Sequence, residues 1–238
     1  VRSLSISIQA NPFSATTIMN IELFNPNLKV LDGEFNFTLH ESQLVTGFAL
    51  DINGKMRDGV VVEKQKARVA YENTIRRRVD PGLLEITGGN SYRVRVYPMP
   101  ANGSRKISIT IRQNLIPVEN KMDYFLPLNV AGSIDHFNTN IEVRNTFLSP
   151  FTTQGLLSQI KFDTDPGKYI LTMDKRNFVA DKPISFSIPF ANAGRTICVD
   201  SNGYCGSRWK VPAREEAKRS INSTTLFWDV SSSADKRD

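Results

Sequence analysis

Three oxygen-bearing side chains near the end of the sequence stand at alternate positions. Asp229, Ser231 and Ser233 follow the apolar run 226–228. A carboxylate and two hydroxyls are hard oxygen donors, the ligand type that Mg²⁺ and Ca²⁺ prefer. The spacing therefore predicts part of a divalent-cation site, whose remaining ligands would come from loops beyond residue 238. We expect the site to be incomplete in this chain and residues 229–238 to be poorly structured or only docked.

The two cysteines of the chain, Cys198 and Cys205, flank a tight-turn signal at Asn202-Gly203. The two thiols could therefore face each other across a hairpin or loop. A local disulfide in an oxidising compartment is the favoured interpretation, and two unrelated thiols in a cytosolic protein are the alternative. Metal binding by the pair is disfavoured because a structural zinc site uses four ligands and neither histidine is nearby in the sequence.

Groups that could perform catalysis do not form a known motif. His40 and His136 stand apart, and the sequence has no His-Glu-x-x-His, Gly-x-Ser-x-Gly or glycine-rich phosphate loop. Carboxylate pairs such as Asp163 with Asp165 occur, but spacing alone does not place two carboxylates in one cleft. The sequence therefore predicts a non-enzymatic chain without a cofactor of its own, with Mg²⁺ or Ca²⁺ held only in the full-length protein.

The chain is basic, with a formal net charge of +6, which favours anionic partners. The densest basic cluster is Arg76, Arg77 and Arg78, a candidate patch for an anionic partner whose alternative role is to cap a helix end. A nucleic-acid surface is disfavoured because stacking aromatics do not accompany the basic residues. No run of eighteen apolar residues occurs, so membrane association would depend on segments outside this chain.

The elements that must position these groups are mostly strands. With 40% hydrophobic and 23% charged residues, the composition is that of an ordinary globular protein. Alternation of apolar and polar residues predicts a mainly β fold of one or two antiparallel β-sandwiches. In the segment 92–97, Arg93 and Arg95 share one face and Val94 and Val96 the other. The clearest predicted strands are 3–9, 16–24, 33–39, 45–52, 83–86, 92–97, 106–111, 124–128, 141–143, 159–162, 169–173 and 184–189.

One segment departs from the alternating pattern. Residues 63–78 contain no Gly or Pro, and an apolar stripe recurs at helical spacing. The three arginines 76–78 close the segment, where cations favour the negative end of the helix dipole. Asp80-Pro81-Gly82 then predicts a turn. We expect one amphipathic helix of about four turns, packed on the first sandwich.

Several ordered blocks between residues 33 and 111 resemble the VIT domain, named for vault proteins and the inter-alpha-trypsin inhibitor heavy chains. The order and punctuation of several blocks are more specific than any one short motif. The resemblance implies a non-catalytic module found beside a von Willebrand A domain in secreted, surface-associated or large-assembly proteins. The blocks are 45–48, 52–55, 62–72, 80–85 and 92–100.

The end of the chain is similar to the start of a von Willebrand A domain. Residues 223–233 are an apolar strand running into Asp-x-Ser-x-Ser, which resembles the metal-ion-dependent adhesion site of that family. The sequence thus predicts a VIT-like domain over 1–130, a further β-rich and connecting segment over 131–220, and the first strand of a truncated A-like domain over 221–238.

These features together predict an interaction or scaffolding module of an extracytoplasmic or surface-associated VIT–von Willebrand A protein. Its partners would be proteins of unknown identity, together with the following A-like domain of the intact protein. Two alternatives remain open. One is a carbohydrate-active or other envelope-processing enzyme, which a pocket with two facing carboxylates would favour. The other is a cytosolic assembly component, which free thiols at Cys198 and Cys205 would favour.

Overall fold

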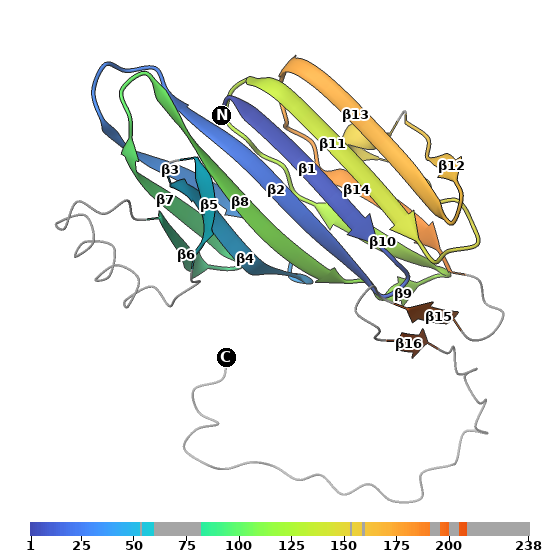
Figure 1. The fold of residues 1–238 in the computed structure, drawn as a ribbon. Coiled ribbons are helices and arrows are strands. Elements are labelled where there is room, and N and C mark those ends of the chain that lie inside the picture. Colours follow the sequence, from blue (N-terminus) through green and yellow to red (C-terminus); the bar gives the residue numbers. More distant parts are fainter. Residues whose placement is uncertain are drawn as a thin grey trace, which may run out of the picture.

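The computed structural model of the chain is drawn in Figure 1. It describes residues 1–52, 54–59, 82–152, 154–158, 160–190, 196–199 and 205–208. Within these ranges the chain is mainly β, and its one helical element is a short 3-10 turn, η1 (Gly155–Leu157).

The largest element is an eight-stranded sheet in the order β12-β13-β11-β1-β2-β8-β4-β5. Its neighbouring strands are antiparallel except for β1 and β11, which run parallel with Ser3 beside His136 and Ala10 beside Val143. Its strands are β1 (Ser3–Ala10), β2 (Ser14–Asn25), β4 (Gln43–Ile52), β5 (Lys55–Asp58), β8 (Gly103–Asn114), β11 (Ile134–Arg144), β12 (Asp163–Asp165) and β13 (Lys168–Phe178).

Residue alternation explains why this sheet buries one face only. In β1, Leu4, Ile6 and Ile8 are buried, whereas the serines between them reach the other face. Successive side chains of a strand point to opposite faces, so this spacing aims every second residue at the core. The opposite face carries short polar side chains in register, such as Ser5 beside Asn20.

Two three-stranded sheets lie against the eight-stranded sheet (Figure 1). The first has the order β3-β7-β6, and the second has the order β14-β10-β9. A separate hairpin pairs β15 with β16. The bounds of these strands are β3 (Leu31–Thr38), β6 (Gly82–Gly88), β7 (Ser91–Met99), β9 (Pro117–Val118), β10 (Lys121–Leu126), β14 (Ile184–Pro189), β15 (Thr196–Val199) and β16 (Cys205–Arg208).

Both small sheets cover the same face of the large one. The hydroxyls of Thr17 on β2 and Tyr124 on β10 are hydrogen-bonded at 2.6 Å in the core. Met19, two residues along β2, lines a cavity together with Phe35 and Tyr92 of the β3-β7-β6 sheet. Residues two apart in a strand share a face, so the small sheets lie side by side in one second layer.

Buried polar groups fix where the second layer sits. Burial raises the pKa of Tyr124, which keeps the phenol neutral and able to donate or accept the bond to Thr17. The Gln43 side chain donates to the Phe125 carbonyl oxygen at 2.7 Å and to Gln113 Oε1 at 3.2 Å. A buried polar group that loses its partner costs about 1–3 kcal/mol, so these bonds disfavour any other docking of the β14-β10-β9 sheet.

The prediction of a mainly β fold is confirmed. The amphipathic helix expected at 63–78 falls within residues 60–81, outside the described part of the chain, and the described residues contain no α-helix. The strand expected at 159–162 is wrong for residues 160–162. There the chain forms a local turn instead, because the Ile160 amide donates to the Leu157 carbonyl oxygen at 2.9 Å and the Thr152 hydroxyl binds the Ile160 carbonyl oxygen at 2.8 Å.

The strands beyond residue 130 continue the sheet that begins at β1. The strand β11 lies between β1 and β13, and one core contains buried side chains from both sides of residue 130. Phe137 and Ile141 on β11 are fully buried, as are Ile6 and Ile8 on β1. Residues 131–190 therefore share a sheet and a core with residues 1–130.

Candidate functional site on the three-stranded sheet

The candidate site residues singled out from the sequence are only partly described. Asp229, Ser231 and Ser233 lie outside the described residues, as do Arg76, Arg77 and Arg78. The two cysteines lie on the two strands of the β15–β16 hairpin. In its register Cys198 is opposite Gly206, and Cys205 is opposite Val199. The cysteines are thus close along the hairpin but do not form a directly opposed pair.

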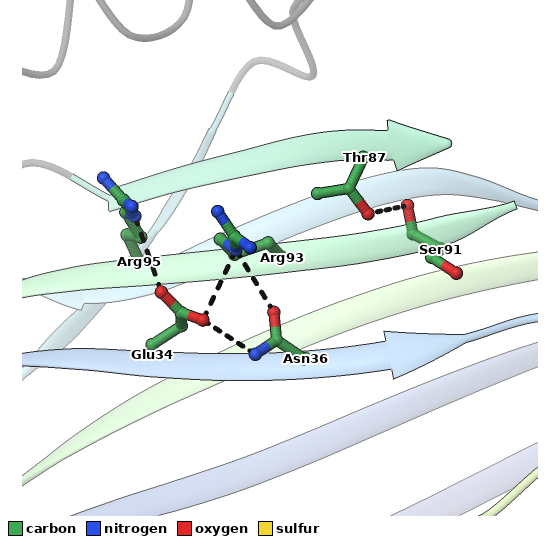
Figure 2. A network of polar contacts seen from close by, with 6 residues as sticks. All are labelled: Glu34, Asn36, Thr87, Ser91, Arg93 and Arg95. Carbon is green, nitrogen blue, oxygen red and sulfur yellow. Dashed lines mark hydrogen bonds and ion pairs between the residues drawn. The ribbon is translucent and has the colours of Figure 1, made fainter. Parts of the chain in front are cut away.

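A polar network lies on the outer face of the β3-β7-β6 sheet, the face turned away from the core (Figure 2). Glu34 of β3 forms ion pairs with two arginines of β7. Arg93 Nε lies 3.3 Å from Glu34 Oε1, and Arg95 Nε lies 3.7 Å from Glu34 Oε2. Asn36 donates to Glu34 Oε1 at 2.7 Å and accepts from Arg93 Nε at 3.4 Å.

The strand register brings this network together. Glu34 pairs with Arg95, and Asn36 pairs with Arg93, in the antiparallel β3–β7 ladder. The period of two along β7 places Arg93 and Arg95 on one face, as the sequence predicts. The sequence alone does not show that Glu34 and Asn36 are the partners of the arginines, because only the register shows which strand lies opposite. Ion pairs this exposed contribute about 0.2–1 kcal/mol each, so the network orders the surface more than it stabilises the fold.

The β6–β7 turn is tied to the large sheet by Asn90, which has a positive φ of 56°. Its side-chain amide donates to the His40 carbonyl oxygen at 2.7 Å and to the Gln43 carbonyl oxygen at 3.1 Å. Tyr92 donates its hydroxyl to Asn90 Oδ1 at 2.9 Å. These contacts hold the β3-β7-β6 sheet against the turn that leads into β4, so the outer face and the edge of the small sheet have a fixed position.

Two cavities lie along β3, the strand at one end of the β3-β7-β6 order. One, of about 450 Å³, is lined by residues 31–36 of β3 and by residues 129–131. The other, of about 680 Å³, is lined by residues 35–38 of β3 and by residues 127–130. Phe35, Asn36, Asn129 and Val130 line both, so the two cavities adjoin. Such volumes suit a small ligand or a few residues of a peptide.

A second charged cluster lies where β11 and β13 approach the β12 hairpin. Glu142 accepts hydrogen bonds from Arg144 and from Lys168, whose Nζ lies 3.2 Å from Glu142 Oε2. Lys168 also lies 3.4 Å from Asp165. The hydrogen bond from Arg144, followed by that from Lys168, holds the pKa of Glu142 below its usual range. Two acids balance two bases here, which is typical of a cluster that stabilises the sheet edge.

The Glu142→Gln variant is expected to be slightly less stable than the parent at neutral pH and equally stable in acid. Because the pKa of Glu142 is lowered on folding, its contribution is present above the ordinary glutamate pKa and is lost as the pH falls through the lowered value. Urea unfolding between pH 7 and about pH 3 checks this. Asp174→Asn, which removes an exposed carboxylate from β13, should not show the same convergence. A pH-independent difference for Glu142→Gln would contradict the expectation.

No group of three or more His, Cys, Asp or Glu side chains within the described ranges is arranged to hold a metal ion. In the same ranges, no helix is long and apolar enough to cross a membrane.

Comparison with known proteins finds a family match for the N-terminal part of the chain. Residues 1–111 match the family described as the Vault protein inter-alpha-trypsin (VIT) domain. Inter alpha-trypsin inhibitor heavy chain 4 of Mus musculus is 24% identical over 162 residues, which cover 63% of this chain and 17% of that protein. A von Willebrand factor A domain-containing protein of Dictyostelium discoideum is 24% identical over 143 residues, which cover 58% of this chain and 17% of that protein.

A solved structure shows the same fold at low identity. A Legionella pneumophila protein assigned to nutrient binding superposes with a TM-score of 0.50 at 15% identity, covering 80% of this chain and 66% of that one. At this identity the likeness concerns the fold alone. The chain spans less than a fifth of the length of the heavy chain and of the Dictyostelium protein. The family match thus shows a VIT domain over residues 1–111 of the chain.

Proposed function

We infer that the chain is a non-catalytic protein-interaction module of an extracytoplasmic VIT–von Willebrand A protein. The observation that carries this proposal is the VIT match over residues 1–111, together with relatives named for von Willebrand A domains and for inter-alpha-trypsin inhibitor heavy chains. The rigid edge and outer face of the β3-β7-β6 sheet support it, because they offer a fixed surface to a partner.

The Asp229, Ser231 and Ser233 triplet supports a following A-like domain in the intact protein. A carboxylate and two hydroxyls are donors that fit Mg²⁺ or Ca²⁺. In the intact protein these three residues would supply part of the ligand set, and other loops of the A-like domain would supply the rest. Calorimetric titration with Mg²⁺ should find no submillimolar binding by this chain, and submillimolar binding would contradict the proposal of an incomplete site.

The extracytoplasmic location is supported by the relatives named for inter-alpha-trypsin inhibitor heavy chains. The disulfide between Cys198 and Cys205 that the sequence predicts would add to this support, but the β15–β16 register does not pair the two residues. We expect no free thiol in protein isolated in its native redox state, and two free thiols after reduction. The readout is titration of the unfolded protein with a thiol reagent. Two reactive thiols before reduction would instead favour the cytosolic assembly component.

Partner capture tests the interaction function directly. The intact protein, the intact protein lacking residues 1–190, and the 238-residue chain are each used as bait in extracts of the source organism. Bound proteins are then quantified by mass spectrometry. We expect one partner to be enriched by the intact protein and by the chain, and lost when residues 1–190 are removed. Equal capture without residues 1–190 would overturn the proposal.

A further inference from the structure

Two aromatic side chains are exposed on the connection between β11 and η1. Phe147 is 94% exposed and Phe151 is 41% exposed. No other Phe, Tyr or Trp side chain in the described part of the chain is exposed. Large aromatic rings bury most of their surface in cores and interfaces. Two exposed rings on one short connection therefore indicate a surface that binds a ligand.

Hydrogen bonds hold the backbone that carries both rings. The Tyr169 hydroxyl donates to the Phe147 carbonyl oxygen at 3.4 Å. Phe151 is bridged to Ser187 of β14 by two main-chain hydrogen bonds, of 3.0 and 2.8 Å. A ligand therefore meets two rings on a fixed backbone, and its binding loses little free energy to ordering of the connection.

Each exposed ring lies at a cavity. Phe147 and Tyr169 line one of about 420 Å³, and Phe151 and Phe162 line one of about 450 Å³. Both volumes fall within the range of about 300–1,000 Å³ that is typical of ligand pockets. Along the connection, Leu148 alone separates the residues that line the first cavity from those that line the second. One ligand can therefore occupy both cavities.

The connection has no charge of its own. Residues 145–160 contain Asn, Gln, Ser and Thr but no Asp, Glu, Lys or Arg, in a chain of which 23% is charged. Among the described charged residues that line the two cavities, Asp165 and Lys168 form an ion pair and only Lys161 has none. Over the segment 142–168 the acids equal the bases in number. They are Glu142, Asp163 and Asp165, and Arg144, Lys161 and Lys168. Transfer of an unpaired charge out of water is costly, so the surface suits a neutral ligand.

A neutral sugar has the surface that this lining complements. A sugar ring has an apolar face of C–H groups, which packs on an aromatic ring, and hydroxyls that exchange hydrogen bonds with amides and other hydroxyls. Thr164 lines the first cavity and Ser158 the second, and neither hydroxyl has a hydrogen-bond partner within the described residues. Phe147 and Phe151 are four residues apart, so their Cα atoms are separated by at most about 14 Å. A linear oligosaccharide of a few units can contact both rings.

We propose that the β11–η1 connection binds a neutral linear oligosaccharide, whose sugar rings pack on Phe147 and Phe151. The hydroxyls and amides of the two cavities exchange hydrogen bonds with the sugar hydroxyls. The connection lies beside β11, β12 and β13, at the opposite end of the eight-stranded sheet from β4 and β5 (Figure 1). This surface is separate from the outer face of the β3-β7-β6 sheet, so the inference goes beyond the proposed protein-interaction function.

Titration of the 238-residue chain with neutral tetrasaccharides tests the proposal. The probes are the linear β-1,4-linked tetramers of glucose, of N-acetylglucosamine and of mannose, and the α-1,4-linked tetramer of glucose. We expect at least one probe to bind with a Kd below about 1 mM by calorimetry. Its C–H protons should shift upfield in NMR spectra, because they lie over an aromatic ring. Binding of none of the probes would overturn the proposal. So would tighter binding of the anionic tetragalacturonate, which Lys161 would favour.

Substitutions at Phe147, with a matched control, locate the site. Phe147→Ala should weaken binding of the tetrasaccharide at least about tenfold, because the ring supplies much of the apolar area that the sugar covers. Phe147→Trp retains an aromatic face and should bind within about threefold of the parent. Leu28→Ala is the control, because Leu28 is 89% exposed on the β2–β3 connection and its truncation should leave the affinity unchanged. Equal affinity of Phe147→Ala and Leu28→Ala would overturn the site.

Partner capture in the presence of the bound tetrasaccharide distinguishes two sources of the sugar. Release of the captured protein would support a glycan attached to that protein, whereas unchanged capture would support a free polysaccharide. A third outcome contradicts both sources. If the parent binds no tetrasaccharide and Phe147→Ala loses the captured protein, the connection is a surface for a protein and the sugar is overturned.

Discussion

The fragment 1–130, produced without the rest of the chain, is expected not to fold cooperatively. It contains all of the residues that match the VIT family, and every strand up to β10. However, β1 would lose β11, its parallel neighbour over eight residue pairs. In the fragment β10 would also lose β14, its partner from Lys121 to Leu126.

The magnitude of the loss decides this expectation. A fully buried large apolar side chain contributes about 1.5–3 kcal/mol, and the net stability of a domain is about 5–15 kcal/mol. The deleted segment takes its own conformational entropy cost with it, so the loss to the fragment is the apolar surface of 1–130 that becomes uncovered. That surface is large, because nine such side chains of the common core, each at most 2% exposed, lie beyond residue 130. They are Ile134, Phe137, Ile141, Val143, Leu157, Leu171, Ile184, Phe186 and Ile188.

The fragment is compared with residues 1–190 in two measurements. These are thermal unfolding followed by circular dichroism and the dispersion of amide NMR signals. We expect a cooperative transition and dispersed signals only for 1–190, which retains β11, β13 and β14. A fragment 1–130 that melts cooperatively within a few degrees of 1–190 would support the division at residue 130 that the sequence suggested. The outcome also decides which boundaries any partner experiment must use.

The strands that were predicted from the sequence are those with a strong local pattern. In β8, Ile107, Ile109 and Ile111 alternate with polar residues, and the structure buries those three side chains. Such alternation is decided within a few residues, so one sequence contains it. The parallel pairing of β1 with β11 joins segments more than one hundred residues apart. It has no local signature, so residues 131–220 were expected to be a separate segment.

The polar network of the candidate site shows the same limit of prediction from the sequence. The common face of Arg93 and Arg95 follows from the period of a strand, but their partner Glu34 lies about sixty residues earlier and is chosen by the β3–β7 register. The edge position of β3 is also a property of the whole sheet order. Sequence reasoning could thus predict the chemistry of one strand, whereas the cavities beside β3 required the assembled fold.

The substitution Gly155→Ala is expected to destabilise the chain by about 2–5 kcal/mol. Gly155 begins the η1 turn with a φ of 77°, where a residue with a Cβ is strained by about 1–2 kcal/mol. An added Cβ would also lie 2.3 Å from the Pro183 carbonyl oxygen. Relief of that overlap requires a backbone shift, which adds about 1–3 kcal/mol.

The carbonyl oxygen of Pro183 has little freedom to move away. It accepts a hydrogen bond from the Leu156 amide at 2.9 Å, and Ser185 donates to the Gln154 carbonyl oxygen at 3.0 Å across the same contact. Pro183 directly precedes β14, which is paired with β10. A shift at Gly155 would therefore disturb the fully buried Leu157 and the start of β14 together.

Gly167→Ala separates the overlap from the backbone strain. Gly167 has the same φ of 77°, but an added Cβ there would have no atom within 4 Å. The Gly167→Ala variant should lose only the stability that the backbone strain costs, about 1–2 kcal/mol. Urea unfolding of both variants and the parent gives the difference, which we expect to exceed about 1 kcal/mol. Equal losses of unfolding free energy in the two variants would mean that the η1 turn shifts without an energetic cost. The β14-β10-β9 sheet would then be held by its strand pairing and buried hydrogen bonds, and not by the contact between Gly155 and Pro183.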